Sequence, residues 1–167
     1  YYIYDSGDIE YLLAPNYNWV EIDGRYGGDG DYLSSLSDGG NNGDDVETID
    51  LPFTFRFYGQ SYDEISICSN GWVGLGETNM ASFRNYPVPG AGGPFPMIAG
   101  FWDDLTLTNG GRVYTWYDSN NKQFIIQWSR VRTYQNSSTE TFQIMLRDPD
   151  YYLTPTNDGE ILIQYMD

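Results

Sequence analysis

Large apolar and polar side chains alternate over residues 51–58 of the sequence. Because successive side chains of a β-strand point to opposite faces of its sheet, this period of two predicts a strand with one apolar face. Pro52 stands near the start of the run and has no N–H group for pairing, so this end should lie at a sheet edge or just before pairing begins. The apolar positions are Leu51, Phe53, Phe55 and Phe57.

The segment Ser69–Gly71 predicts a β-hairpin. An Asn-Gly pair is typical of two-residue hairpin turns, and here it separates the alternating run 65–67 from the apolar run 72–75. Residues 78–96 contain four prolines and no regular period, which predicts an irregular surface connection. Strands should resume in the apolar run 97–102.

The second half of the chain predicts further short strands. Turn-forming clusters at 109–111 and 118–122 bracket the runs 112–117 and 123–130, which favours an antiparallel meander. Two more alternating runs contain Leu146 and Tyr165. About eight short strands separated by turn signals predict an all-β fold, an antiparallel two-sheet β-sandwich with long irregular loops. The length of 167 residues fits a single domain that spans residues 1–167.

Composition and charge narrow the possible functions. The 24 acidic residues outnumber the 8 Lys and Arg and give a formal net charge of −16, which repels phosphate backbones and anionic membranes. We therefore expect no nucleic-acid partner. No apolar run approaches the roughly 20 residues of a membrane-spanning helix, so we also expect no membrane insertion. The chain has no histidine, which excludes the usual Ser-His-Asp and Cys-His nucleophile systems and predicts that it is not an enzyme.

The single cysteine, Cys68, cannot form a disulfide within the chain. It lies in the alternating run 65–68, a position that predicts an inert cysteine in a strand and not a reactive thiol.

The acidic Gly/Asp-rich loop 23–45 is a candidate calcium site. Twelve of the 24 acidic residues lie in the first fifty positions. Oxygen-bearing residues interleaved with glycine suit a hard cation, because glycine lets the backbone curl until several oxygens converge. The loop matches neither an EF-hand nor the glycine-rich nonapeptide repeat, so a solvated acidic loop is the alternative. The candidate calcium ligands in this loop are Asp29, Asp31, Asp38, Asp44 and Asp45.

The pair Asp103-Asp104 directly follows the apolar run that ends at Trp102. Three interpretations compete: one Asp closes the following loop by accepting backbone N–H bonds, both bind calcium, or they are catalytic. Adjacent residues of an extended strand point to opposite faces, which is poor geometry for shared catalysis. A glycan-active enzyme would need two carboxylates about 5 to 10 Å apart in a cleft, and the candidates for that role are Glu64, Glu77, Asp103 and Asp104.

Aromatic side chains in exposed register form a third candidate site. Flat rings on a sheet face stack against sugars or bind proteins, whereas the alternative is that they fill the core or pair across strands. The Asn136-Ser137-Ser138 sequence also matches the N-glycan acceptor pattern. The candidate aromatic residues are Tyr58, Tyr62, Tyr114, Trp116, Trp128, Tyr134, Tyr151 and Tyr152.

Six short strings occur in a recognisable order. They are Tyr17–Ile22, Leu51–Phe53 with Phe57–Gly59, Cys68–Trp72, Met97–Leu105, Gly111–Tyr114 and Asp158–Ile161. Together they resemble the nidogen-like (NIDO-like) β-sandwich modules of large secreted bacterial proteins. These include modules appended to gingipain-like or subtilisin-like peptidases that carry type IX secretion tails. The resemblance implies an extracellular or cell-surface module without catalytic residues.

The C-terminal end of this chain departs from the pattern. Modules of this type usually continue past the strand that holds Gln164 and Tyr165 into a further strand or two, whereas the sequence here ends at Asp167. The resemblance therefore implies an open sheet edge, which is a template for a strand of another chain. Either a neighbouring subunit or residues beyond this sequence would then complete the sandwich.

These observations give two expectations for function. The first is a non-catalytic extracellular structural or adhesive module that binds other protein chains, including copies of itself, and assembles into a fibre or a surface layer. The second is a carbohydrate-binding accessory domain of a secreted hydrolase, with glycans as partners. Apart from calcium, we expect no cofactor.

Overall fold

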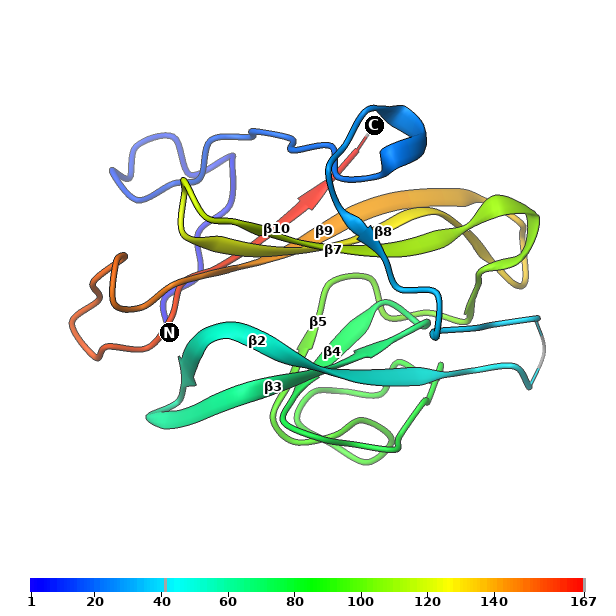
Figure 1. Cartoon of the computed structure of the whole chain (residues 1–167). Helices are drawn as coiled ribbons and strands as arrows, with labels where there is room; N and C mark the ends of the chain where they lie inside the picture. The colour runs from blue at the N-terminus through cyan, green and yellow to red at the C-terminus, as the bar shows by residue number, and fades with distance from the viewer. Residues whose placement is uncertain (41, 167) are drawn as a thin grey trace.

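The computed structural model describes residues 1–40 and 42–166, and over these residues the fold is almost entirely β. Two antiparallel sheets form a sandwich (Figure 1), as the sequence predicts. Two single-turn 3-10 helices, η1 (Gly24–Tyr26) and η2 (Thr108–Gly110), are the helical elements of the described residues. The strands are β1 (Asp31–Tyr32), β2 (Val46–Phe57), β3 (Gln60–Cys68), β4 (Trp72–Leu75), β5 (Met97–Ala99), β6 (Leu105–Thr106), β7 (Arg112–Asp118), β8 (Gln123–Thr133), β9 (Thr139–Arg147) and β10 (Ile161–Tyr165).

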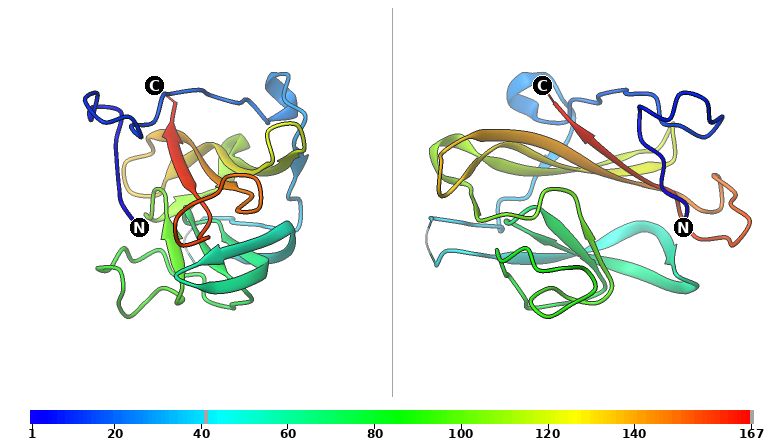
Figure 2. Two further views of the ribbon diagram at one scale, coloured as in Figure 1. Left: turned by 90° about the vertical axis from the view of Figure 1, so that its left-hand side faces the viewer. Right: turned by 180° about the vertical axis from the view of Figure 1, so that it is seen from behind.

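The larger sheet, sheet A, has the strand order β1-β7-β8-β9-β10, and β6 also pairs with the end of β8. Strands β7 to β10 are consecutive neighbours, so the predicted antiparallel meander is confirmed. The smaller sheet, sheet B, has the order β2-β3-β4-β5 and faces sheet A (Figures 1 and 2).

Strand β2 is longer than the alternation predicts, because it begins at Val46, which pairs with Cys68. Its pairing with β3 is interrupted between Asp50 and Phe55. Pro52 falls in this interruption, on an edge strand of sheet B. The missing N–H group of proline is therefore accommodated as predicted.

The predicted hairpin joins β3 to β4, and Ile65 pairs with Leu75 across it. Gly71 has a φ of 80° in its turn. A Cβ atom at this position would lie 1.9 Å from the carbonyl oxygen of Phe101, so only glycine fits. The predicted irregular connection 78–96 is also confirmed, since no strand lies between β4 and β5.

The main core fills the space between the two sheets. Phe55, Ile67 and Val73 of sheet B belong to the same buried cluster as Trp128 and Phe142 of sheet A. The rings of the last two stack with centroids 5.0 Å apart. Alternation along each strand thus places one apolar face of each sheet inside, as a sandwich requires.

The chain also covers much of both outer faces. The N-terminal segment 17–30 crosses sheet A (Figure 2) and packs Ile22 against a small apolar cluster on its outer face. On sheet B, the indole N–H groups of Trp72 and Trp102 both donate to the Ser82 carbonyl, at 2.9 and 2.8 Å. Cys68 is buried in that cluster, and burial raises the pKa of its thiol to about 12. The predicted position in a strand is confirmed, and burial with a raised pKa is typical of an unreactive thiol.

Candidate functional site

Three loops meet at the hairpin turn that ends β3, and we call this region the acidic end. The buried side chain of Asn70 ties the loops together. Its amide nitrogen donates to Asp44 Oδ1 at 2.8 Å, and its amide oxygen accepts the backbone N–H of Leu105 at 2.9 Å. The backbone N–H of Leu107 donates to the carbonyl of Asp38 at 3.3 Å. These bonds bring two predicted ligands, Asp38 and Asp44, to the loop that carries Asp104.

Asp38 is the buried acid of this group, with an exposed fraction of 5%. Its Oδ1 accepts the N–H of Gly40 at 3.0 Å, whereas its Oδ2 is buried and has no hydrogen-bond partner among the described residues. Burial raises the pKa of Asp38, and the charges of Asp44 and Asp104 raise it further. The Gly40 amide and the nearby Ser69 hydroxyl offset part of this rise.

Asp103 and Asp104 have different environments. Asp103 Oδ1 accepts the N–H of Asp104 at 2.8 Å, which is the loop-closing bond that the sequence suggested as one interpretation. The pKa of Asp104 is raised by burial and by the charges of Asp44 and Asp103. Both acids border a surface hollow of about 230 Å³, so water reaches this side of the acidic end. The hollow is lined by Phe83, Arg84, Asn85, Tyr86, Asp103, Asp104 and Gln135.

The other predicted calcium ligands lie apart from this group. Asp31 is exposed in β1 at the edge of sheet A, and Asp29 is exposed just before it. The carboxylate of Asp45 accepts the N–H groups of Ser37 and Val46, at 2.8 and 2.9 Å, and so holds its own loop. Among the described residues, no three acidic side chains form a compact ligand set for a metal. The structure therefore gathers part of the predicted set and does not assemble the whole.

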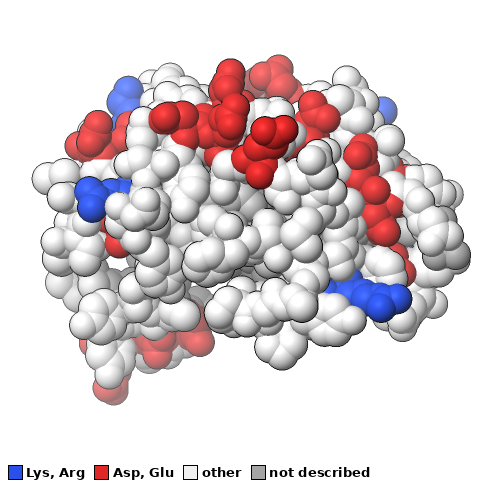
Figure 3. All heavy atoms as spheres, turned by 90° about the horizontal axis from the view of Figure 1, so that it is seen from below, with Lys and Arg blue, Asp and Glu red and all other residues white. Residues whose placement is uncertain are grey.

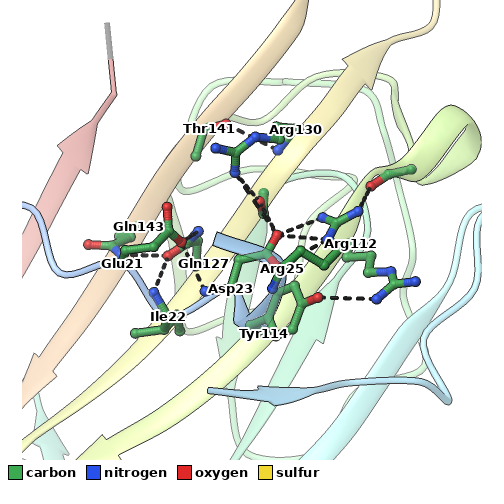
Figure 4. Close-up of polar contacts among 12 residues, drawn as sticks. Glu21, Ile22, Asp23, Arg25, Arg112, Tyr114, Gln127, Arg130, Thr141 and Gln143 are labelled. Carbon is green, nitrogen blue, oxygen red and sulfur yellow. Dashed lines mark hydrogen bonds and ion pairs between the residues drawn. The ribbon is translucent and has the colours of Figure 1, made fainter. Parts of the chain in front are cut away.

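A second polar cluster surrounds Asp23 (Figure 4) and was not singled out by the sequence. Asp23 is fully buried. Its carboxylate accepts bonds from the Arg25 guanidinium at 2.6 and 3.0 Å and from the Ser129 hydroxyl at 2.6 Å. Burial alone would raise the pKa of Asp23, but the bonds from Arg25 and Ser129 outweigh it and hold the pKa well below its usual range. Arg130 lies 4.0 Å from the same carboxylate and covers the ring of Tyr26.

A row of buried glutamines fastens the N-terminal segment beside Asp23. Gln127, Gln143 and Gln164 face one another on β8, β9 and β10. Gln164 exchanges hydrogen bonds with the backbone of Asn18 at 2.9 and 3.1 Å, and Gln127 accepts the N–H of Ile22 at 3.1 Å. Each glutamine stands between two large apolar residues in the sequence. That repeated pattern is the signal that could have revealed the row.

The outer edge of β10 is unpaired. The even-numbered residues of β10 form its hydrogen bonds to β9, in phase with the bonds of Glu160 and Met166 at its two ends. The N–H and C=O groups of the odd-numbered residues therefore point away from the sheet. No hydrogen bond of the described residues reaches these groups of Ile161, Ile163 and Tyr165. The side chains of Ile163 and Tyr165 are 38% and 49% exposed. The open edge expected from the sequence is present.

The aromatic residues do not form the flat exposed face that we considered. Tyr114 is only 3% exposed because the N-terminal segment covers it, and Trp128 is buried between the sheets, so the prediction that they are exposed was wrong. Trp116 is half-buried. Three candidates that are exposed, Tyr58, Tyr134 and Tyr151, follow three different strands.

Comparisons with known proteins identify the family of this chain. No solved structure gives a significant match, and no helix of the described residues is long and apolar enough to cross a membrane. A family model described as NIDO related matches residues 19–150. This range includes strands β1 to β9, whereas the first 18 residues and β10 lie outside it. Since the match covers well over half of the sequence, the chain belongs to the NIDO-related family.

Proposed function

We propose that this domain is a non-catalytic structural and adhesive module of an extracellular protein, which binds other protein chains, including copies of itself, through the edge of sheet A. The observation that carries this proposal is the unpaired edge of β10, with two half-exposed apolar side chains beside it.

An open edge favours the addition of a strand. Each outward N–H and C=O group of β10 can pair with an extended segment of a partner, and side chains at alternate positions supply selectivity. Ile163 and Tyr165 offer apolar surface at this edge. The N-terminal segment and the connection 78–96 already cover much of the two outer faces, so the edge is the better-suited surface for a partner.

The charge of the domain supports a regulated association. Acidic side chains far outnumber basic ones on the face seen in Figure 3, in keeping with the net charge of −16. Like charges keep free copies apart at long range, and at about 0.15 M salt this repulsion is screened beyond about 8 Å. Strand pairing acts over shorter distances, so it can still hold two copies together.

The test replaces Ile163 with lysine. A charged side chain at an exposed strand edge opposes strand addition, and Ile163 uses none of its backbone groups to pair with β9. Val88→Lys is the control, because Val88 is an exposed apolar residue in the irregular connection over sheet B. Light scattering after size exclusion, over a range of protein concentrations at physiological salt, should show oligomers of the wild type and of Val88→Lys.

The Ile163→Lys variant should remain a monomer at every concentration. A wild type that stays monomeric over the whole range, or an Ile163→Lys variant that associates as the wild type does, would reject self-association through this edge. Circular dichroism of both variants shows whether the sandwich is intact.

A further inference from the structure

We propose that residues 9–13 of one copy pair, as an antiparallel strand, with the open edge of β10 in a second copy, so that Tyr11 lies opposite Ile163. We call residues 9–13 the arm. The inference rests on the proposed function and names the partner of that edge. The arm and the edge are then two halves of one contact, and every copy carries both.

The arm holds large apolar side chains that the rest of the described chain leaves uncovered. Ile9 is 85% exposed, Leu13 is 70% exposed and Leu12 is fully exposed. No residue of 1–16 belongs to any of the three apolar clusters found among the described residues. Exposed apolar side chains gathered in this way mark a surface that binds another protein.

The arm has the sequence of a short strand, although it is not a strand in the single chain. Large apolar residues alternate along it, as in a strand, and Pro15 follows where such a strand would end. In the described structure the N–H of Tyr11 donates instead to the carbonyl of Asp8 at 2.9 Å, and the N–H of Ala14 donates to the carbonyl of Tyr11 at 3.0 Å. These bonds close local turns, and exposed local bonds of this kind open at little cost.

The unpaired groups of β10 match the arm in spacing. The outward N–H and C=O groups belong to alternate residues of β10, and the apolar residues of the arm have the same spacing of two. An antiparallel register centred on Tyr11 and Ile163 uses all of these groups. The opposed pairs are then Ile9 with Tyr165, Tyr11 with Ile163, and Leu13 with Ile161.

This register extends the main core. The ring of Tyr165 lies 6.4 Å from the ring of Phe142, and Ile161 packs against the cluster between the sheets. The odd-numbered side chains of β10 therefore face the core side of sheet A. Opposed residues of an antiparallel pair share one face of the sheet, so three apolar side chains of the arm cover the half-exposed side chains along this edge.

The even-numbered residues determine the direction of the arm. Leu162 packs against the apolar cluster on the outer face of sheet A, whereas Gln164 belongs to the row of glutamines. The antiparallel register places Leu12 opposite Leu162 and Glu10 opposite Gln164, so apolar meets apolar and polar meets polar. A parallel arm would place Glu10 beside Leu162 instead. The antiparallel direction is therefore favoured.

The anchors of the N-terminal residues favour a second copy over the edge of the same chain. The Tyr1 hydroxyl donates to the carbonyl of Gly159, just before β10 begins, at 3.1 Å. Asn18 is bonded to Gln164, near the end of β10. Residues 1–18 therefore run in the same direction as their own β10 and beside it (Figure 2). Antiparallel pairing with this edge would require two reversals between the anchors, whereas the arm of a second copy has no such constraint.

The contact is large enough for a stable dimer when it is exchanged in both directions. A two-fold arrangement contains two arms and two edges, and a side chain such as Tyr11 alone buries about 150 to 250 Å². With four large apolar side chains on each arm, the buried area is on the order of 1,200 Å², where stable interfaces begin. An exchange that does not close passes from copy to copy and builds a fibre.

The test is a disulfide between copies. Opposed residues that exchange no hydrogen bond lie about 4.5 Å apart at their Cα atoms, a separation that suits a disulfide. Leu12 and Leu162 form such a pair in the proposed register. Chains with only Leu12→Cys are mixed with chains with only Leu162→Cys under mild oxidation. A covalent heterodimer should form, as read by non-reducing electrophoresis and mass spectrometry, and each variant alone gives the background.

Glu10→Cys mixed with Leu162→Cys is the matched control, because only a parallel arm brings these positions together. It should give at least tenfold less heterodimer, and the buried Cys68 is common to every variant. An equal yield from the two mixtures would overturn the register, and no heterodimer from Leu12→Cys would overturn the pairing. If the double variant Leu12→Cys/Leu162→Cys forms its disulfide only within single chains, the arm pairs with its own edge and the second copy is wrong.

Measurements of association separate this inference from the proposed function. Tyr11→Lys should weaken self-association at least tenfold, whereas Ile3→Lys, at an exposed position outside the arm, should leave it unchanged. If Ile163→Lys abolishes association while Tyr11→Lys has no effect and no heterodimer forms, the edge still binds a partner and only the arm is wrong. A wild type that stays monomeric and gives no cross-linked product would reject both proposals.

Discussion

Asp23 and Asp38 lie in the same glycine-rich loop of the sequence, and both are buried, yet their surroundings are opposite. Asp23 accepts bonds from a guanidinium, a hydroxyl and a backbone amide, and its pKa is lowered. Asp38 has one unpartnered oxygen and acidic neighbours, and its pKa is raised. Burial of a carboxylate therefore does not define its role; the partners that the fold brings to it do.

The difference separates a carboxylate with a full set of partners from one with an incomplete set. A buried charge is tolerated when its partners replace the bonds that it made to water. Asp23 meets that condition with protein groups alone and fixes the N-terminal segment to β8 through Ser129. Asp38 meets it only in part, through the Gly40 amide and the nearby Ser69 hydroxyl.

The largest expected effect is the loss of Asp23. Asp23→Ala leaves Arg25 and Arg130 without their shared carboxylate, and removal of one partner from a buried pair costs about 3 to 5 kcal/mol of unfolding free energy. The lower end applies, because Arg25 is partly exposed. Urea unfolding at neutral pH measures the change. Asp31→Ala, an exposed control, should have a free energy of unfolding within about 0.5 kcal/mol of the wild type. Equal losses of unfolding free energy in the two variants would contradict the structural role of Asp23.

A smaller effect is expected at the glutamine row that holds the segment around Asp23. Gln143 donates to the carbonyl of Val20 and to Gln127 Oε1. Gln143→Leu therefore leaves the Val20 carbonyl without this donor and leaves Gln127 Oε1 with the N–H of Ile22 alone, at a cost of about 1 to 3 kcal/mol. The N-terminal segment should also be cleaved faster by proteases. Gln135→Leu, in an exposed turn, is the control. Unchanged cleavage of Gln143→Leu would mean that the row does not hold the segment.

The strands were predictable because their signals are local. The alternation 51–57 and the turn at Asn70-Gly71 depend on neighbours in sequence, and both appear as predicted. The first five residues of β2 were missed because Val46 and Ile49 do not share a face, and pairing with β3 defines them as strand. Local signals thus identify a strand more reliably than its ends.

The site was less predictable because it depends on contacts that are distant in sequence. Nothing near Asp23 or Asp38 in the sequence reveals that Asp23 accepts a bond from Ser129 or that the charge of Asp104 raises the pKa of Asp38. The exposure expected for Tyr114 and Trp128 was wrong for a related reason. A strand of sheet A has two faces, and the N-terminal segment covers one while sheet B covers the other.

The smallest expected effect is the pH dependence of the difference between Asp38 and Asp23. A carboxyl whose folded pKa is raised stabilises the fold below its unfolded pKa and loses this contribution as the pH rises through the folded value. Asp38 and Asp104 are of this kind. Their contribution to the free energy of unfolding should therefore increase as the pH falls from 7 toward about 4, the usual carboxyl pKa. Asp23, with a lowered pKa, contributes fully above about pH 4 and loses its contribution only at lower pH.

The comparison of wild type with Asp38→Asn isolates this effect from the general loss of charge repulsion in acid. In chelator at pH 7, Asp38→Asn should be the more stable protein, because it removes a destabilised charge. The two unfolding curves should converge as the pH falls below about 4, where Asp38 becomes protonated in the unfolded chain as well as in the folded one. If Asp38→Asn is instead less stable than the wild type in chelator at pH 7, the charged Asp38 stabilises the fold, as Asp23 does.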